Sequence, residues 1–253
     1  MSSSLPFTEM RLACLITATV RTGSYLLCEA LEETGCAGYP TEAFCPEHRD
    51  SYCHQWGLPV EAGFDDYFRT LIEKGTTPNG VFSVKVHAHH VEPLVRECTF
   101  TGKPFKVLKH LFPTAKYIHL RRRDVRAQAI SYYRADVTNE WWRINGVTNP
   151  HVRKNKEAVF DAARILRLEA TLRWQEQQWE DYFFAEKIEP LRIEYETLWQ
   201  NYRSEVARAL KFLGQNPKLA AKLPEPRLVR QSDSMTAAWR RQLDEQFPVS
   251  EAG

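Results

Sequence analysis

The stretch LACLITATVRTGSYLLCEALEETG, residues 12–35, contains a strand, a short polar turn and a helix in succession. Leu12–Ala18 is an apolar run of strand length, too short for the roughly 20 residues that a membrane-spanning helix needs. The helix is expected from Ser24 to about Thr34, with Gly35 just past its end. A buried strand that leads through a turn into a helix is the first unit of an α/β fold.

The rest of the chain repeats this alternation. Further strands are expected at Val81–Val86, Tyr117–Leu120 and Leu191–Tyr195. Helices are expected at Phe64–Lys74, Asp124–Ala135, about Lys156–Glu186, Leu198–Leu213 and Met235–Gln246. Such alternation predicts a three-layer α/β/α arrangement with a mainly parallel sheet, whose ligands bind beyond the carboxyl ends of the strands.

No repeat and no Gly/Ser linker divides the chain, so a single domain is expected over residues 1–253, with its core at about 12–246. In the long helix, the spacing of five apolar residues predicts one buried face. These residues are Val159, Ala163, Leu166, Ala170 and Trp174. The same segment is a candidate for packing across a homodimer interface.

The composition is that of an ordinary folded protein. Of 253 residues, 43% are hydrophobic and 26% are charged, and 13 Phe, 10 Tyr and 7 Trp exclude disorder as the main state. The net charge of +2 carries no basic excess for nonspecific nucleic-acid binding, so an anion site must be local. The start MSSSLPFTEM lacks the basic and apolar parts of a signal peptide, and a cytoplasmic location is expected.

The six cysteines form no CxxC pair and are expected to be reduced thiols. Cys45 and Cys53 lie near His48 and His54, but their spacing fits no common zinc site. His87, His89 and His90 would point to alternate faces of a strand and into a loop. We therefore expect no metal.

The turn after the first strand has the layout of an anion-binding loop. Free N–H groups and the helix dipole at the start of a helix favour negative charge. Compared with the nucleotide-binding pattern GxxxxGK[ST], Ala18 replaces the first glycine, Ser24 the lysine and Tyr25 the magnesium-binding hydroxyl. Arg21, inside the turn, supplies the cation instead. The alternative is a purely structural turn with Ser24 or Thr22 as the helix cap.

A second candidate anion site follows the strand at 117–120. Three arginines, Arg121–Arg123, precede a helix that contains Ser131, eight residues after Arg123. A phosphate lying along the helix would accept hydrogen bonds from Arg123 and Ser131. The alternative is that the arginines form a solvated cluster and Ser131 only packs.

Together these segments resemble the bacterial trehalose 2-sulfotransferase family of the sulfotransferase superfamily, whose fold is P-loop-like. The resemblance rests on ordered motifs between about residues 12 and 246: VRTGSYLLCEALEETGCAGYPTEAF, TPNGVFSVK, HLRRRDVRAQAISYYRA, IEPLRIEYETLW and LGQNPKLA. It implies an enzyme that uses 3′-phosphoadenosine 5′-phosphosulfate (PAPS) as sulfuryl donor, without a metal, and a possible homodimer.

The resemblance also implies roles for individual residues. The residues expected to hold the 5′-phosphosulfate are Arg21, Thr22, Gly23, Ser24 and Tyr25. Arg123 and Ser131 would bind the 3′-phosphate, Tyr195 would lie near the adenine, and Arg230 would close over the 3′-phosphate. From the residues alone, Tyr195 is equally well explained as a core tyrosine at a strand end.

The same resemblance places the general base at Glu42 and Lys85 near the transferring group. Tyr39, Pro40 and Phe44 surround Glu42 in sequence, and apolar neighbours would raise its pKa toward the working range. His87 is the rival base, because Lys85-Val86-His87 is similar to the Lys-x-His of eukaryotic cytosolic sulfotransferases. Arg21 would stabilise the charge on the leaving group.

The acceptor is expected to be a carbohydrate or glycolipid, with trehalose as one candidate and a small hydroxylated metabolite as another. Trp56, Trp141 and Trp142 lie in stretches that would line a sugar cleft, although tryptophan is more often a core or rim residue. Two other functions stay open at this stage: a small-molecule or nucleotide kinase with a degenerate phosphate loop, and a non-catalytic nucleotide-binding protein.

Overall fold

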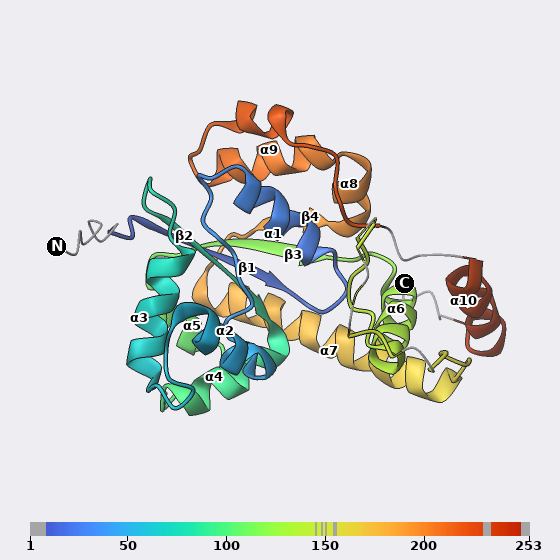
Figure 1. Cartoon of the computed structure of the whole chain (residues 1–253). Coiled ribbons are helices and arrows are strands. Elements are labelled where there is room, and N and C mark those ends of the chain that lie inside the picture. The colour runs from blue at the N-terminus through green and yellow to red at the C-terminus, as the bar shows by residue number, and fades with distance from the viewer. Residues whose placement is uncertain are drawn as a thin grey trace.

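The computed structural model describes residues 9–144, 146–147, 149, 151–153, 156–229 and 234–248 (Figure 1). Its centre is a parallel sheet of four strands in the order β2-β1-β3-β4. The strands are β1 (Leu12–Ala18), β2 (Val81–His87), β3 (Lys116–Arg121) and β4 (Leu191–Glu194). The predicted parallel sheet is confirmed.

Helices cover both faces of the sheet (Figure 1). One face carries α1 (Ser24–Glu33), α8 (Tyr195–Gln200) and α9 (Tyr202–Phe212). The other carries α2 (Arg49–Trp56), α3 (Phe64–Gly75), α4 (Val91–Glu97), α5 (Lys106–Leu111) and α7 (Ala162–Glu186). At the carboxyl end of the strands lie α6 (Val125–Thr138) and α10 (Ser234–Gln246), which packs on α6. The predicted three-layer architecture is therefore confirmed.

The central strand β1 supplies both layers of the core. Cys14, Ile16 and Ala18 belong to the apolar cluster on the side of α1 and α9, whereas Ala13 and Leu15 belong to the cluster on the side of α3 and α7. Side chains alternate between the faces of a strand, so a nearly continuous apolar run, interrupted in β1 by the buried Thr17, is what a sheet covered on both faces requires.

The prediction for the long helix is wrong in its start and in its buried face. The helix begins at Ala162, and the Asp161 carboxylate caps it by accepting from the Arg164 N–H at 2.9 Å. Val159 lies before this start and is 71% exposed, and Trp174 is 59% exposed. The buried residues are Ile165, Glu169, Leu172, Gln175, Trp179, Tyr182 and Phe183. Apolar residues occur on two stripes of α7, and counting from Val159 selected the outer one.

Other predicted boundaries also change. The helix expected over Leu198–Leu213 is two helices, α8 and α9, which are separated at Asn201, where φ is −126° and ψ is 45°. Tyr195 begins α8 rather than ending β4. The short helices α2, α4 and α5 were not predicted, because six to eight residues are too few for a clear helical period. Of the described helices, none has the length and apolar composition needed to cross a membrane.

The two tryptophans of α7 test which of its faces is buried. Trp179 is fully buried and its Nε1–H donates to the Ala18 carbonyl at 3.1 Å. Trp179→Ala is expected to lower the free energy of unfolding by about 3–5 kcal/mol, and Trp174→Ala to change it by less than about 0.5 kcal/mol. Urea denaturation measures both. Equal losses for the two variants would contradict the orientation of α7.

Candidate active site

A cavity of about 1210 Å³ lies at the carboxyl ends of the strands. The turn after β1, the end of β2, α6 and the start of α8 all contribute to its lining. Among the lining residues are Arg21, Ser24, Glu42, Lys85, Ser131 and Tyr195. This is the edge at which an open parallel sheet is expected to bind its ligands.

The turn between β1 and α1 has a backbone shaped for an anion. Arg21 and Gly23 adopt positive φ angles of 66° and 75°, and Gly23 is the N-cap of α1. The Thr22 hydroxyl donates to the Thr19 carbonyl at 3.0 Å, which closes the turn on itself. No side chain of the described residues caps α1, so the alternative that Ser24 or Thr22 serves as its cap is wrong. The start of the helix is thus left available to a negative group from outside.

Tyr195 packs directly on this turn. A Cβ atom at Gly23 would lie 2.6 Å from Cδ2 of the Tyr195 ring, so glycine is required there for space as well as for its φ angle. The Arg122 guanidinium lies 4.8 Å from the centroid of the same ring. The first residue of α8 and the end of β3 thereby meet the β1 turn.

Arg21 and Ser131 are brought together as anion ligands would be. The Nε–H of Arg21 donates to the Ser131 hydroxyl at 3.0 Å, and its Nη1 donates to the Trp141 carbonyl. Burial, and then the charge of Arg122, lower the pKa of Arg21 to about 10, so it remains a cation at neutral pH. A phosphate at this point would meet a desolvated positive charge.

Arg123, by contrast, is directed away from Ser131. Its side chain is 61% exposed, its Nε lies 2.8 Å from a Glu194 carboxylate oxygen and 3.7 Å from one of Glu196, and it does not line the cavity. Arg122 lines the cavity instead. The structure therefore does not bring Arg123 and Ser131 together as expected.

The strand period explains which arginine reaches the cavity. Arg121 pairs with Glu176 of α7, with 2.9 Å between Nε and Oε1. Its successor Arg122 points to the opposite side, toward Tyr195. Because side chains alternate along an extended chain, counting from the strand rather than back from Ser131 would have identified Arg122. Arg230, the other expected phosphate ligand, lies outside the described residues.

Glu42 lies at the centre of a compact charged group. The Thr41 carbonyl accepts from the Lys85 N–H at 2.8 Å, which joins the loop of Glu42 to β2. Lys85 Nζ lies 2.8 Å from Oε2 of Glu42, and His87 Nε2 lies 3.0 Å from Oε1. The Tyr52 hydroxyl accepts from the Glu42 N–H at 3.1 Å. The predicted base, the predicted sulfuryl ligand and the rival base are therefore in direct contact.

The expectation that apolar neighbours raise the pKa of Glu42 is wrong. Burial alone would raise it, but the Lys85 ammonium and the His87 ring outweigh burial and hold the pKa of Glu42 well below its usual range. The Glu42 carboxylate raises the pKa of Lys85 against the effect of burial. Glu42 is thus a carboxylate and Lys85 an ammonium at neutral pH.

Aromatic side chains also line the cavity. Tyr52, Trp141 and Trp142 line it, as expected of a sugar cleft for the two tryptophans. Trp56 does not line it, because its ring packs between Tyr52 and Tyr67, with centroids 4.9 and 5.3 Å away. Tyr52 is a residue that the sequence did not single out, since α2 was not predicted.

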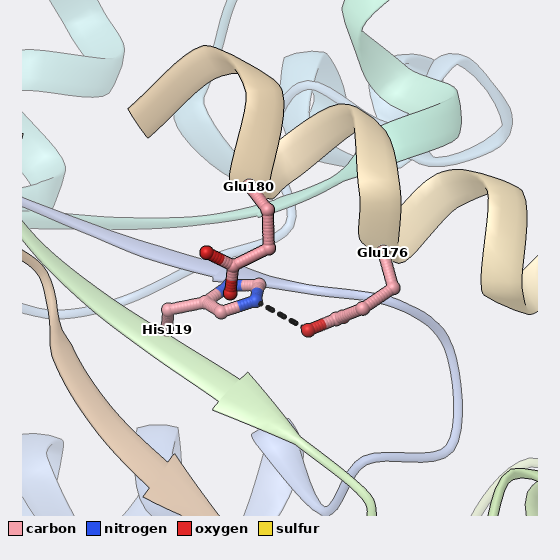
Figure 2. Close-up of side chains that lie close together, drawn as sticks. All are labelled: His119, Glu176 and Glu180. Carbon is pink, nitrogen blue, oxygen red and sulfur yellow. Dashed lines mark hydrogen bonds and ion pairs between the residues drawn. The ribbon is translucent and has the colours of Figure 1, made fainter. Parts of the chain in front are cut away.

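A separate group of His119, Glu176 and Glu180 lies between β3 and α7 (Figure 2). Their ligand atoms are within 4.8 Å of one another. The two carboxylates already have cationic partners, because Arg121 pairs with Glu176 at 2.9 Å and Arg192 with Glu180 at 2.6 Å. The arrangement is that of an ion-pair network joining the sheet to α7.

Three similarities to known proteins agree with this geometry. The family model described as Stf0 sulphotransferase matches residues 13–246. The trehalose 2-sulfotransferase of Mycobacterium tuberculosis is 32% identical over 89% of this chain and 91% of that protein. The trehalose 2-sulfotransferase of Mycolicibacterium smegmatis is 30% identical over 90% of this chain and 92% of that protein.

The fold is similar to that of a solved sulfotransferase from Alicyclobacillus acidocaldarius. The TM-score is 0.51 at 13% sequence identity, and the alignment covers 93% of this chain and 95% of the other. At this identity the likeness concerns the fold alone. It confirms the predicted sulfotransferase fold.

Two glycines with the same φ angle separate backbone strain from the contact with Tyr195. Gly23 and Gly214 both have φ of 75°, but no atom lies within 4 Å of a Cβ at Gly214. Gly214→Ala is expected to lower the free energy of unfolding by about 1 kcal/mol through backbone strain alone. Gly23→Ala is expected to lose about 1–3 kcal/mol more, because the methyl group overlaps the Tyr195 ring.

A double variant checks the cause of that extra loss. Gly23→Ala combined with Tyr195→Ala is expected to remove the steric part, so that the two changes are not additive in chemical denaturation. Additive losses would show that Tyr195 does not pack on the turn.

Proposed function

The chain belongs to the Stf0 sulfotransferase family, and from this membership we propose that it transfers a sulfuryl group from PAPS to a hydroxyl of a carbohydrate acceptor. The observation that carries the proposal is that Glu42 contacts Lys85 and His87 in the same cavity that the anion-binding turn between β1 and α1 lines. The names of the two relatives make trehalose the first acceptor to test.

The donor site is assembled from two strand ends. The Arg21–Ser24 turn supplies the helix start and a partly buried cation for the 5′-phosphosulfate. Ser131 and Arg122, both in the cavity lining, supply a hydroxyl and a guanidinium for the 3′-phosphate. Tyr195 packs on the turn and offers an aromatic face to the nucleotide. We place the 3′-phosphate at Arg122 rather than at Arg123.

A kinase reading fits these residues less well. At the position of the magnesium-binding hydroxyl the chain has Tyr25, whose side chain is 46% exposed, and Ser24 replaces the lysine. Arg21 and the start of α1 would neutralise the negative charge of the bound anion without a metal ion.

PAPS supplies an activated sulfur–oxygen bond with adenosine bisphosphate as the leaving group. The protein must align the acceptor hydroxyl with that bond, remove its proton and stabilise the charge that appears on the leaving phosphate. Glu42 is placed to take the proton as the hydroxyl oxygen bonds to sulfur, and Arg21 and Lys85 to stabilise the departing oxygen. Lys85 therefore has two anionic partners, the Glu42 carboxylate and the donor.

The acceptor would bind beside the charged group, against the aromatic side chains that line the cavity. Tyr52, Trp141 and Trp142 have flat aromatic faces of the kind that pack against sugar rings. Tyr52 lies next to Glu42, because its hydroxyl accepts a hydrogen bond from the Glu42 backbone N–H. We propose a single catalytic domain over the matched residues. The homodimer and the cytoplasmic location remain predictions.

Two neighbouring arginines test the donor site. Arg122→Ala is expected to weaken binding of 3′,5′-adenosine bisphosphate by about 10- to 100-fold, the loss of one charge-assisted hydrogen-bond partner. Arg123→Ala, the matched control on the exterior, is expected to change the affinity by less than about twofold. Calorimetric titration with a chelator present measures both. The reverse order of the two effects would restore Arg123 as the phosphate ligand.

The reaction is tested by incubating the protein with PAPS and trehalose, again with a chelator, and detecting sulfated trehalose by mass spectrometry. Glu42→Gln is expected to lower kcat by about 10²–10⁴-fold, because a general base contributes this much, while bisphosphate binding is retained. If the wild-type protein binds the bisphosphate and sulfates no carbohydrate, the proposed acceptor class is wrong. If it binds no bisphosphate, the proposed function is wrong.

A further inference from the structure

The ring of His87 is held on both sides by hydrogen-bonding groups. Nε2 lies 3.0 Å from Oε1 of Glu42, and Nδ1 lies 3.3 Å from the Ala18 carbonyl oxygen. His87 is 3% exposed, so water does not compete freely for either ring nitrogen. Trp179 Nε1–H also donates to the Ala18 oxygen, at 3.1 Å, which shows that this oxygen faces donors.

The two ring nitrogens of His87 differ in their hydrogen-bonding partners. Nε2 faces a carboxylate and must carry hydrogen to bind it. Nδ1 faces the Ala18 carbonyl, which can only accept a hydrogen bond. His87 also starts a short turn in which the backbone N–H of His90 faces the His87 side chain. A protonated Nδ1 can therefore donate to the Ala18 oxygen, and an unprotonated Nδ1 can accept from the His90 N–H.

The protonation state of His87 acts on Glu42 through Oε1. A charged ring at 3.0 Å stabilises the carboxylate and makes it a poorer proton acceptor, whereas a neutral ring still donates from Nε2 and keeps the carboxylate in place. Oε2, held by Lys85 at 2.8 Å, is the oxygen left to take the acceptor's proton when Lys85 turns to the donor.

We propose that His87 is the positioning residue of the general base: it holds Glu42 through Nε2–H and, by gaining or losing a proton on Nδ1, sets how readily Glu42 removes the acceptor's proton. This inference rests on the proposed function. In the step itself the hydroxyl O–H bond breaks, its proton goes to Oε2 of Glu42, the oxygen–sulfur bond forms, and the electron pair of the breaking sulfur–oxygen bond leaves with the adenosine bisphosphate. His87 transfers no atom.

The other ionisable groups around this ring do not change charge near neutrality. Burial and the charge of His87 lower the pKa of His89 to about 4, and burial and the same neighbour lower the pKa of His90 well below its ordinary value. Lys85 has a raised pKa and Glu42 a lowered one, as described above.

The remaining neighbours contribute no titration near pH 7 either. Burial raises the pKa of Tyr52 and of Tyr25, and raises those of Cys28 and Cys45 to about 12. The Cys45 S–H, which donates to the Glu47 carboxylate at 3.1 Å, lowers the pKa of that carboxyl. From β1 the ring is faced by the Ala18 carbonyl, which also accepts from the Trp179 N–H of α7, and neither of these groups titrates.

The direct test is nitrogen NMR of the donor-free wild-type protein labelled with ¹⁵N-histidine, between pH 5 and pH 9. The expected result is that Nε2 of His87 stays protonated throughout and that Nδ1 loses its proton within this range. A Nδ1 signal that stays in one state over the whole range, or an Nε2 without hydrogen, would overturn the proposal. This readout needs no activity, so it also stands if the proposed function fails.

The kinetic test compares His87→Gln with His89→Gln. His89 is the matched control, because its ring stacks on that of His87 with 5.6 Å between centroids. For the wild type, kcat/KM is expected to fall by about tenfold per pH unit on the acid side, as for an inactivating protonation. A glutamine at 87 keeps an N–H for Glu42 but cannot titrate, so this acid limb should disappear with KM changed less than about threefold. The limb should persist in His89→Gln.

An acid limb that survives in an active His87→Gln variant would show that His87 is only structural. A wild-type protein that binds 3′,5′-adenosine bisphosphate and sulfates no carbohydrate would contradict the proposed acceptor class, and the NMR result would still decide whether Nδ1 of His87 changes its protonation.

Discussion

The parallel register of β1 with its two neighbours is the constraint on which the site depends. Ala18, the last residue of β1, pairs with His87 of β2 on one side and with Leu120 of β3 on the other. Its carbonyl oxygen also faces the His87 ring and the Trp179 indole, so that one atom joins β1, β2 and α7. Because the strand ends are level, three segments far apart in sequence meet at one edge: the Arg21 turn, the Lys85–His87 segment and the arginines after β3.

Burying the charged groups at this edge of the sheet costs free energy. Lys85 and His87 are nearly buried, and burying charged groups is favourable only when they are well paired. Glu42 satisfies both, and its own pKa is strongly lowered as a result. A carboxylate held by two partners is a weak base until one partner leaves. If the proposed function is right, competition between Glu42 and the donor for Lys85 would couple donor binding to activation of the base.

Most of the sheet and the turn could be predicted from the sequence, because strand-length apolar runs such as Leu12–Ala18 have few other solutions when glycine and polar residues follow them. The face of α7 could not, because two apolar stripes compete and the choice depends on the sheet beside it. The short helix α2 could not be predicted, because its eight residues show no clear helical period of apolar side chains, and Tyr52 was missed with it. The contact of Glu42 with Lys85 required tertiary structure, since it is the bridge between Thr41 and Val84 that brings the loop to β2.

A crystal structure of the complex with 3′,5′-adenosine bisphosphate would show directly whether the two strand ends form the donor site. We expect the 5′-phosphate at the start of α1, beside Arg21 and Ser24, and the 3′-phosphate within hydrogen-bond distance of Arg122 and Ser131. We also expect that Lys85 has turned from Glu42 toward the nucleotide. A bisphosphate bound away from the β1 turn, or a 3′-phosphate held by Arg123, would contradict this donor site.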